Sequence, residues 1–209
     1  MNADVASTRL LLFSGIAAGV IFCTVATVEM LRRPGFDLSR HAISMLSLGE
    51  GGWIMKTAFI ASGILTLICA AGIYARLGPA WSGVTAALLT GCYGLGLIIA
   101  GVFDAPASFG FPPGVPADQQ PVMTPGAIVH SAAFMLAFSG LILACLVFAY
   151  QFLAAGQTLM FVASLAAGIA MPVLVGLGMS MTMAPGIAFY CAALTGWFWL
   201  MAALYAIGR

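Results

Sequence analysis

Charged residues are scarce in this chain. Asp, Glu, Lys and Arg make up 6% of its 209 residues, whereas 63% are hydrophobic and the mean hydropathy is +1.11. A soluble domain of this length needs a far more polar surface, so the composition excludes that class. The seven Lys and Arg residues also form no basic run long enough to follow a phosphate backbone, so we expect no nucleic-acid partner.

Cysteine is sparse as well, and its number is odd. All five cysteines fall inside long apolar segments, at Cys23, Cys69, Cys92, Cys145 and Cys191. An odd number of thiols inside such segments forms neither a disulfide framework nor a metal cluster, so we expect small packing residues.

Long apolar runs dominate the rest of the sequence. About 20 apolar residues in helical form cross the hydrocarbon core of a bilayer. Six such runs occur, at about 8–28, 53–74, 81–103, 126–150, 158–180 and 186–206. The sequence therefore predicts an all-α polytopic bundle of six transmembrane helices, with residues 1–209 as a single integral membrane domain. Membrane lipids are its expected surroundings, and its oligomeric state is left open.

Polar residues are distributed unevenly between the two sides of the predicted bundle. Six spans place both chain ends on one side. Lys and Arg divide almost equally between the sides, so the positive-inside rule leaves the orientation open. Five of the six acidic residues lie on the side opposite the chain ends, namely Glu29, Asp37, Glu50, Asp104 and Asp118.

The connection between spans 1 and 2 carries an unusual concentration of polar groups in the sequence FDLSRHAISMLSL, residues 36–48. Placed on a helix of 3.6 residues per turn, its polar side chains fall within an arc of roughly 120°. These side chains are Asp37, Arg40, His41, Ser44 and Ser47. Pro34-Gly35 precedes the segment and three glycines follow it. We therefore predict a short amphipathic helix that lies in the interface or dips into the bundle.

The connection between spans 3 and 4 is rich in proline. Six of the ten prolines lie between Asp104 and His130. Proline resists helix formation and favours extended structure. Long connections without secondary structure are often lids or binding loops. We expect this loop to cap a polar site, with Phe109 and Phe111 tucked into the mouth of the bundle.

Four residues on this side form a candidate site: His41, Ser44, Asp104 and His130. His41 and His130 are the two histidines of the chain, and ionisable groups at membrane depth are costly and mark functional sites. In an intramembrane hydrolase acting on a lipid or an apolar small molecule, His130 would be the general base. Asp104 would orient it or hold a metal, and Ser44 or His41 would be the nucleophile or a second ligand.

The order of these features resembles the membrane protein family named domain of unknown function 998. The resemblance rests on Asp37-Leu38-Ser39 with Ser44 and the segment 46–49, on Phe103-Asp104 before the proline-rich loop, and on His130 at the start of a helix. It implies a six-span fold in the bacterial inner (cytoplasmic) membrane, and it implies no reaction. Family members carry a Gly-apolar-x-x-Arg pattern entering the last span. Here Gly186 is followed by Tyr190, which stands where the arginine is expected.

Several chemistries remain open. The order of serine, aspartate and histidine is loosely similar to the alkaline-ceramidase type of membrane metal hydrolase, although the His-x-x-x-His near the C-terminus of those enzymes is missing. A divalent metal such as zinc would need His41, His130 and Asp104 as ligands. Haem between the two histidines and copper at Met123, Met179, Met181 and Met183 are disfavoured, because haem needs opposed imidazoles and methionine is a common packing residue.

A function without catalysis fits the same composition. The chain would then be a binder or carrier of apolar small molecules, or an accessory subunit of a larger membrane complex. In that case Asp104 and His130 would only form hydrogen bonds or gate the site.

Overall fold

The computed structural model describes residues 3–209, which form six long helices and one short 3₁₀ helix. The predicted all-α architecture is confirmed, and each helix begins and ends within a few residues of its predicted apolar run. The elements are α1 (Ala3–Arg32), η1 (Ile43–Ser47), α2 (Gly52–Leu77), α3 (Trp81–Val102), α4 (Pro125–Ala154), α5 (Thr158–Met179) and α6 (Pro185–Gly208).

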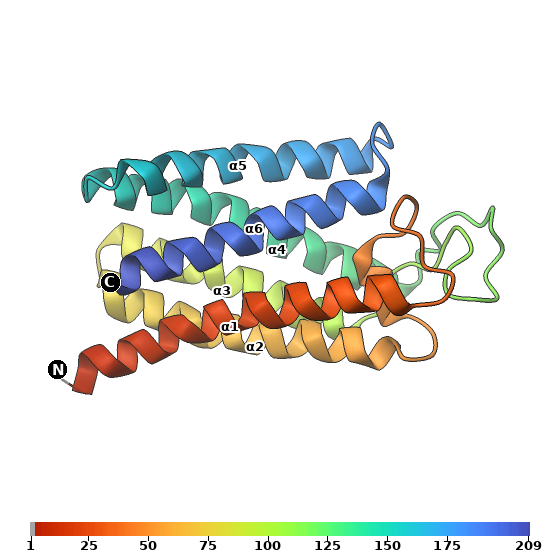
Figure 1. Ribbon diagram of the computed structural model, residues 1–209, viewed down its shortest axis with the longest axis horizontal. Helices are drawn as coiled ribbons and strands as arrows, with labels where there is room; N and C mark the ends of the chain where they lie inside the picture. The colour runs from red at the N-terminus through yellow and green to blue at the C-terminus, as the bar shows by residue number, and fades with distance from the viewer. Residues whose placement is uncertain (1–2) are drawn as a thin grey trace.

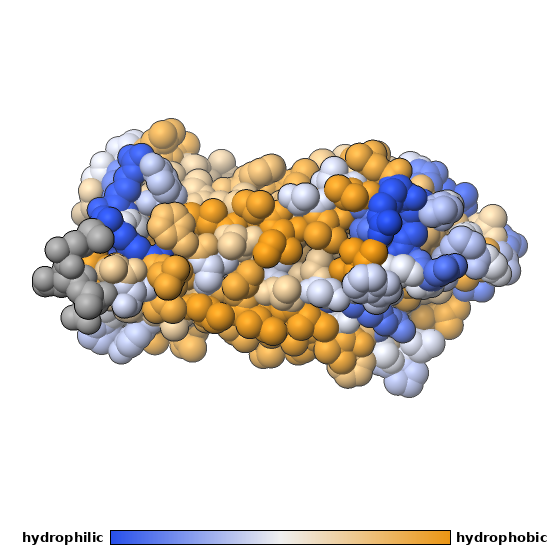
Figure 2. Space-filling view, turned by 60° about the horizontal axis from the view of Figure 1, so that its bottom comes forward, coloured by the Kyte–Doolittle hydropathy of each residue, from blue (hydrophilic) through white to orange (hydrophobic). Residues whose placement is uncertain are grey.

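Each helix packs against the next one in the sequence, and α6 returns to pack against α1, so the six helices form a closed ring (Figure 1). Both chain ends lie at one end of this ring, and the two long connections lie at the other. An apolar band separates two polar ends on the surface (Figure 2). Each of the six helices is long and apolar enough to cross a bilayer, so the chain is an integral membrane protein.

Glycine allows the helix backbones to approach closely. A Cβ atom added to Gly63 of α2 would lie 2.6 Å from the carbonyl oxygen of Gly94 on α3, and one added to Gly94 would lie 2.8 Å from the carbonyl oxygen of Gly63. Membrane helices associate through such close contact, because lipid supplies no hydrophobic driving force between them. The two glycines therefore fix the spacing of α2 and α3, which form one wall of the cavity described below.

The connection after α1 differs from its prediction. Only Ile43–Ser47 is helical, as a 3₁₀ helix, whereas residues 37–40 form turns. The backbone N–H of Asp37 donates to Nδ1 of His41 at 2.9 Å, and Oδ1 of Asp37 accepts from the backbone N–H and the hydroxyl of Ser39 at 2.8 and 2.7 Å. Such local side-chain bonds compete with helical ones, which explains the shorter helix. The bonds from Ser39 also lower the pKa of the Asp37 carboxyl from its ordinary value.

The proline-rich connection folds back over the same end of the bundle. Phe111 is fully buried, as expected, and its ring centroid lies 5.4 Å from those of both Phe36 and His41. Two polar contacts join the connections directly: Nε2 of His41 bonds to the carbonyl oxygen of Phe109 at 2.9 Å, and the Arg40 guanidinium donates to that of Ala117 at 2.9 Å. We call residues 33–51 and 103–124 together the cap.

Candidate functional site

A cavity of about 400 Å³ lies inside the ring of helices, beneath the cap. All six long helices contribute to its wall. Trp197 of α6 is fully buried and packs against two lining residues, with its ring centroid 5.6 Å from that of Phe22 and 5.1 Å from that of Tyr93. Trp197 does not line the cavity. It lies one turn of α6 beyond the lining residue Ala193, further from the cap, and supports the Phe22 and Tyr93 rings from behind.

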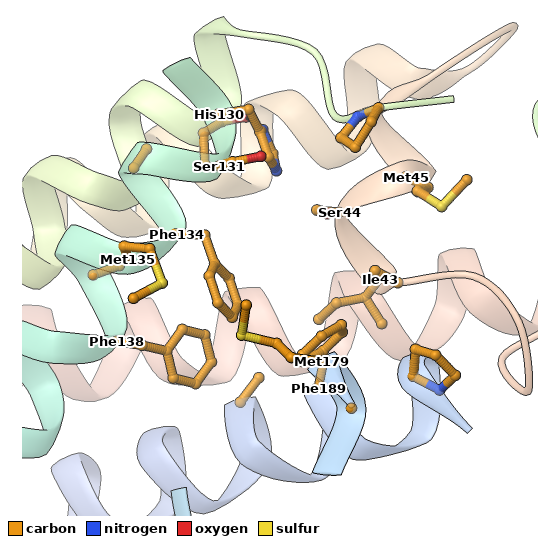
Figure 3. A pocket seen from close by; sticks show the side chains of 18 of the residues that line it. Ile43, Ser44, Met45, His130, Ser131, Phe134, Met135, Phe138, Met179 and Phe189 are labelled. Atoms are coloured by element: carbon orange, nitrogen blue, oxygen red, sulfur yellow. The ribbon is translucent and has the colours of Figure 1, made fainter. Parts of the chain in front are cut away.

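The polar groups of the cavity gather toward the cap. Arg40, Ser44 and Ser108 belong to the cap, and His130 lies in the second turn of α4 beside it. The deeper wall is aromatic and aliphatic, with Tyr93 bringing one hydroxyl, and it includes Phe22, Phe59, Leu97, Phe134, Phe138 and Ala193. Figure 3 shows Ser44 and His130 on different walls of the same space, with Phe134 and Phe138 further along α4. The cavity therefore has a polar end at the membrane interface and an apolar end within the bilayer.

The wall between α4 and the end of α5 reaches the lipid-facing surface. Met135 of α4 and Met179 of α5 both line the cavity, yet they are 51% and 63% exposed. Both residues lie in membrane-spanning helices, so the surface that they expose faces lipid. We call this side of the cavity the lateral opening.

His130 is held in one orientation by the end of α3. Its Nδ1 lies 3.1 Å from the carbonyl oxygen of Ala100 and 2.9 Å from that of Phe103. Because both partners are acceptors, Nδ1 carries the proton and donates it. The carbonyls at a helix C-terminus lack partners within the helix, so His130 also satisfies α3. Its Nε2 has no hydrogen-bond partner among residues 3–209 and is left as an acceptor at the cavity wall.

His41 has a different environment. It is 2% exposed and does not line the cavity. Its Nδ1 accepts a hydrogen bond from the backbone of Asp37, so Nε2 carries the proton that it donates to the carbonyl oxygen of Phe109. Both ring nitrogens are occupied, and neither is free for a haem iron or a metal. His41 joins the two connections of the cap.

The remaining two candidates also separate. Ser44 is half-buried in the cavity wall, and its hydroxyl makes no hydrogen bond within the described chain. Asp104 does not line the cavity. Its side chain is 57% exposed, and Oδ1 pairs with Nζ of Lys56 at 2.6 Å. The structure thus brings Ser44 and His130 to one space, places His41 within the cap and leaves Asp104 at the surface.

The residues considered for zinc do not form a metal site. From residue 3 onward, no three His, Cys, Asp or Glu side chains gather closely enough to hold a metal ion. Both ring nitrogens of His41 and the Asp104 carboxylate have other partners, so within the described residues Nε2 of His130 is the one free ligand atom of the three side chains. This arrangement does not fit a zinc centre. Two of the methionines considered for copper, Met179 and Met181, line the cavity.

Two features of the site were not among the sequence candidates. Arg40 supplies the one charged side chain among the cavity-lining residues of the described chain. Glu29 and Arg33 form a buried ion pair at the end of α1, from which Arg33 donates to the carbonyl oxygens of Leu46 at 2.7 Å and Leu48 at 3.1 Å. The i, i+4 spacing of Glu29 and Arg33 is a recognisable signal for such a pair, whereas the partners in the cap are visible only in the fold.

Comparison with known proteins assigns the chain to a family. The sequence model described as "Protein of unknown function (DUF998)" matches residues 16–206. The chain belongs to the DUF998 family. No curated protein and no solved structure matches it. The match covers nearly all of the six-helix ring and the whole cap, so the cavity lies entirely within the DUF998 region.

The entry to the last helix of this DUF998 protein has a structural explanation. A Cβ atom at Gly186 would collide with the carbonyl oxygens of Leu38 and His41, so glycine lets α6 begin directly beneath the cap. Four residues further, the hydroxyl of Tyr190 lies 2.6 Å from Oγ1 of Thr27. At the position where the resemblance led us to expect an arginine, Tyr190 thus links α6 to α1 through a neutral hydrogen bond.

Proposed function

We propose that this DUF998 protein binds a membrane amphiphile, with the polar end of the ligand beneath the cap and its apolar chain between the helices. The observation that carries the proposal is the polarity of the cavity: Arg40, Ser44, Ser108 and His130 lie at one end, and apolar side chains line most of the rest. A volume of about 400 Å³ falls within the range of small-molecule sites, roughly 300–1,000 Å³.

The depth of the cavity suits a chain-like ligand. The part of α4 that lines the cavity runs from His130 to Phe138, and at about 1.5 Å per residue it spans roughly 12 Å. A chain that follows this wall would reach less than halfway across a hydrocarbon core about 30 Å thick. Because its chain comes from an equally apolar bilayer, burial in the cavity gives little hydrophobic gain. Selectivity must therefore come from the shape of the wall and from the polar end. The resemblance implies the bacterial cytoplasmic membrane as the source of this ligand.

Hydrolysis of such an amphiphile is the second candidate function, favoured by one observation. Nδ1 of His130 is fixed by two carbonyl oxygens, which leaves Nε2 as a proton acceptor at the cavity wall that Ser44 also lines. A general base needs this tautomer and an attacking hydroxyl or water within hydrogen-bond reach. Asp104 would not be the group that orients the imidazole, because Nδ1 of His130 bonds to the carbonyl oxygens of Ala100 and Phe103 and the Asp104 carboxylate pairs with Lys56.

Lipid analysis of the purified protein tests the binding proposal. Ala193 of α6 lines the cavity, whereas Ala202 of the same helix faces outward. We expect Ala193→Phe to reduce the amount of a specific co-purified lipid, measured by mass spectrometry, and Ala202→Phe to leave it unchanged. Equal lipid content and composition in the wild type and both variants would contradict the proposal.

Two further variants separate binding from hydrolysis. If the protein only binds, His130→Gln changes affinity and no product forms with any variant. If it hydrolyses an ester or amide of the bound lipid, His130→Gln abolishes product formation. Asp104→Asn should leave lipid binding unchanged, because this carboxylate lies outside the cavity.

A further inference from the structure

The cations at the cap end of the molecule are almost all paired with a carboxylate. Arg32 and Arg33 both pair with Glu29, and Lys56 pairs with Asp104. Arg40 is the exception: within the described chain its guanidinium has no carboxylate within salt-bridge distance. Its one hydrogen bond, to the carbonyl oxygen of Ala117, uses a single N–H group, and a guanidinium has five.

The acidic groups near Arg40 lie outside the cavity. Asp37 is close enough for Arg40 to contribute to its lowered pKa, but its carboxylate bonds to Ser39. Asp118 is exposed and directly follows Ala117, whose carbonyl oxygen accepts the hydrogen bond from Arg40. Glu50 is also exposed, at the far end of the connection that contains Arg40. None of these three carboxylates lines the cavity. Arg40 itself is exposed, whereas Ser108 and His130 are buried. A ligand at the polar end therefore meets a positive charge at the solvent-facing rim of the cavity, and hydroxyl groups and the His130 imidazole further inside.

We infer that the amphiphile is anionic, with a carboxylate or phosphate headgroup held by Arg40. This inference rests on the proposed function. A planar guanidinium matches both kinds of oxyanion in geometry, and charge-assisted bonds are about twice as strong as neutral ones. The hydroxyl of Ser44, which lines the same end of the cavity and makes no hydrogen bond within the described chain, adds a neutral donor, whereas the hydroxyl of Ser108 donates to Sδ of Met45 at 3.9 Å. The apolar chain of the ligand then occupies the deeper wall.

A series of ligands with one chain and different headgroups tests the inference. The probes are a saturated long-chain fatty acid, the alcohol and the amine with the same chain, and the matching lysophosphatidic acid. Their dissociation constants are measured with the full chain in lipid nanodiscs, at a pH that keeps the acids ionised. We expect the fatty acid or the lysophosphatidic acid to bind at least about tenfold more tightly than the alcohol. The stronger of the two identifies the headgroup as carboxylate or phosphate.

Variants at the same end of the molecule assign the preference to Arg40. Arg40→Gln should remove the advantage of the acid over the alcohol and leave the affinity for the alcohol unchanged, which also shows that the variant is folded. Arg40→Lys should retain part of the advantage. Lys56→Gln removes a cation of the same region that does not line the cavity, so it should preserve the preference for the acid.

The outcomes distinguish this inference from the proposed function. If the wild type binds the acid and the alcohol equally, or binds the amine most tightly, the protein does not select an anionic headgroup and this inference is wrong. The proposal that the protein binds an amphiphile is not affected by that result. If Arg40→Gln keeps the preference for the acid, the assignment to Arg40 is wrong. If no probe binds and Ala193→Phe leaves the co-purified lipids unchanged, both the proposed function and this inference fail.

Discussion

The carboxylate of Glu29 and the guanidinium of Arg33, one turn apart at the end of α1, form a buried ion pair at 3.1 Å, with 2% and 8% of their side chains exposed. Arg33 also donates to the carbonyl oxygens of Leu46 and Leu48. This arrangement joins the last turn of α1 to the segment that carries Ser44. The ion pair therefore positions one wall of the cavity although neither side chain lines it.

Removing the carboxylate should destabilise the cap. Breaking a buried ion pair typically costs about 3–5 kcal/mol, and for Glu29→Gln we expect the lower end of that range, because Arg33 keeps its carbonyl partners. Hydrogen exchange at residues 43–48 should rise more than exchange in the transmembrane helices. Arg32→Gln is the matched control: Arg32 pairs with the same carboxylate but is 53% exposed, so its loss should cost about 0–1 kcal/mol. If the two variants were destabilised equally, burial of the Glu29–Arg33 pair would not account for its contribution to stability.

His41 should stabilise the cap and make no contact with the ligand. Replacing it with alanine removes the bonds to Asp37 and Phe109, leaves the Phe109 carbonyl without its partner and takes a ring away from Phe111. The lost bonds predict a destabilisation of about 1–3 kcal/mol. Limited proteolysis and hydrogen exchange should show loosening of residues 104–124. Nitrogen NMR of the wild type should find a proton on Nε2 of His41 and on Nδ1 of His130. The same tautomer at both histidines would contradict the roles assigned to them.

The lateral opening should set the rate at which ligand enters. Met135→Trp places a larger side chain at this opening, and Leu146→Trp places one on the outward face of the same helix, away from the cavity. A barrier at the opening slows entry and exit alike, so we expect Met135→Trp to lower both rate constants several-fold with little change in affinity. The measurement is the transfer of a fluorescent fatty acid from vesicles to protein in nanodiscs. Unchanged rates would indicate entry through the cap instead.

The fold was largely predictable from the sequence. Six apolar runs of about 20 residues each match the thickness of the bilayer core, and within that core a helix satisfies all of its backbone hydrogen bonds internally. The sequence could not separate the roles of the two histidines. His41 and His130 differ in which backbone carbonyls lie beside them, and those carbonyls come from connections distant in the chain. Asp104 was placed correctly at the end of α3, but the direction of its side chain depends on Lys56 of α2. Arg40 could not be singled out from the sequence either, because it differs from the other cations at the cap end only in having no carboxylate partner, and those ion pairs are known only from the structure.

The contact between α6 and the cap should tolerate no side chain at Gly186. The carbonyl oxygens of Leu38 and His41 lie so close to the position of a Cβ atom that they would overlap with it, so Gly186→Ala must push the turn at residues 37–41 away from α6. Overpacking typically costs about 1–3 kcal/mol, and the displaced turn carries Arg40. We therefore expect a lower Tm together with weaker binding of the anionic probe. Gly176→Ala is the control, because a Cβ added there would have no atom of another helix or of the cap within 4 Å in the described chain. Within a helix that change should stabilise by up to about 1 kcal/mol. A Gly186→Ala variant as stable as the wild type would mean that the cap does not rest on the start of α6, and the position of Arg40 over the cavity would lose its support.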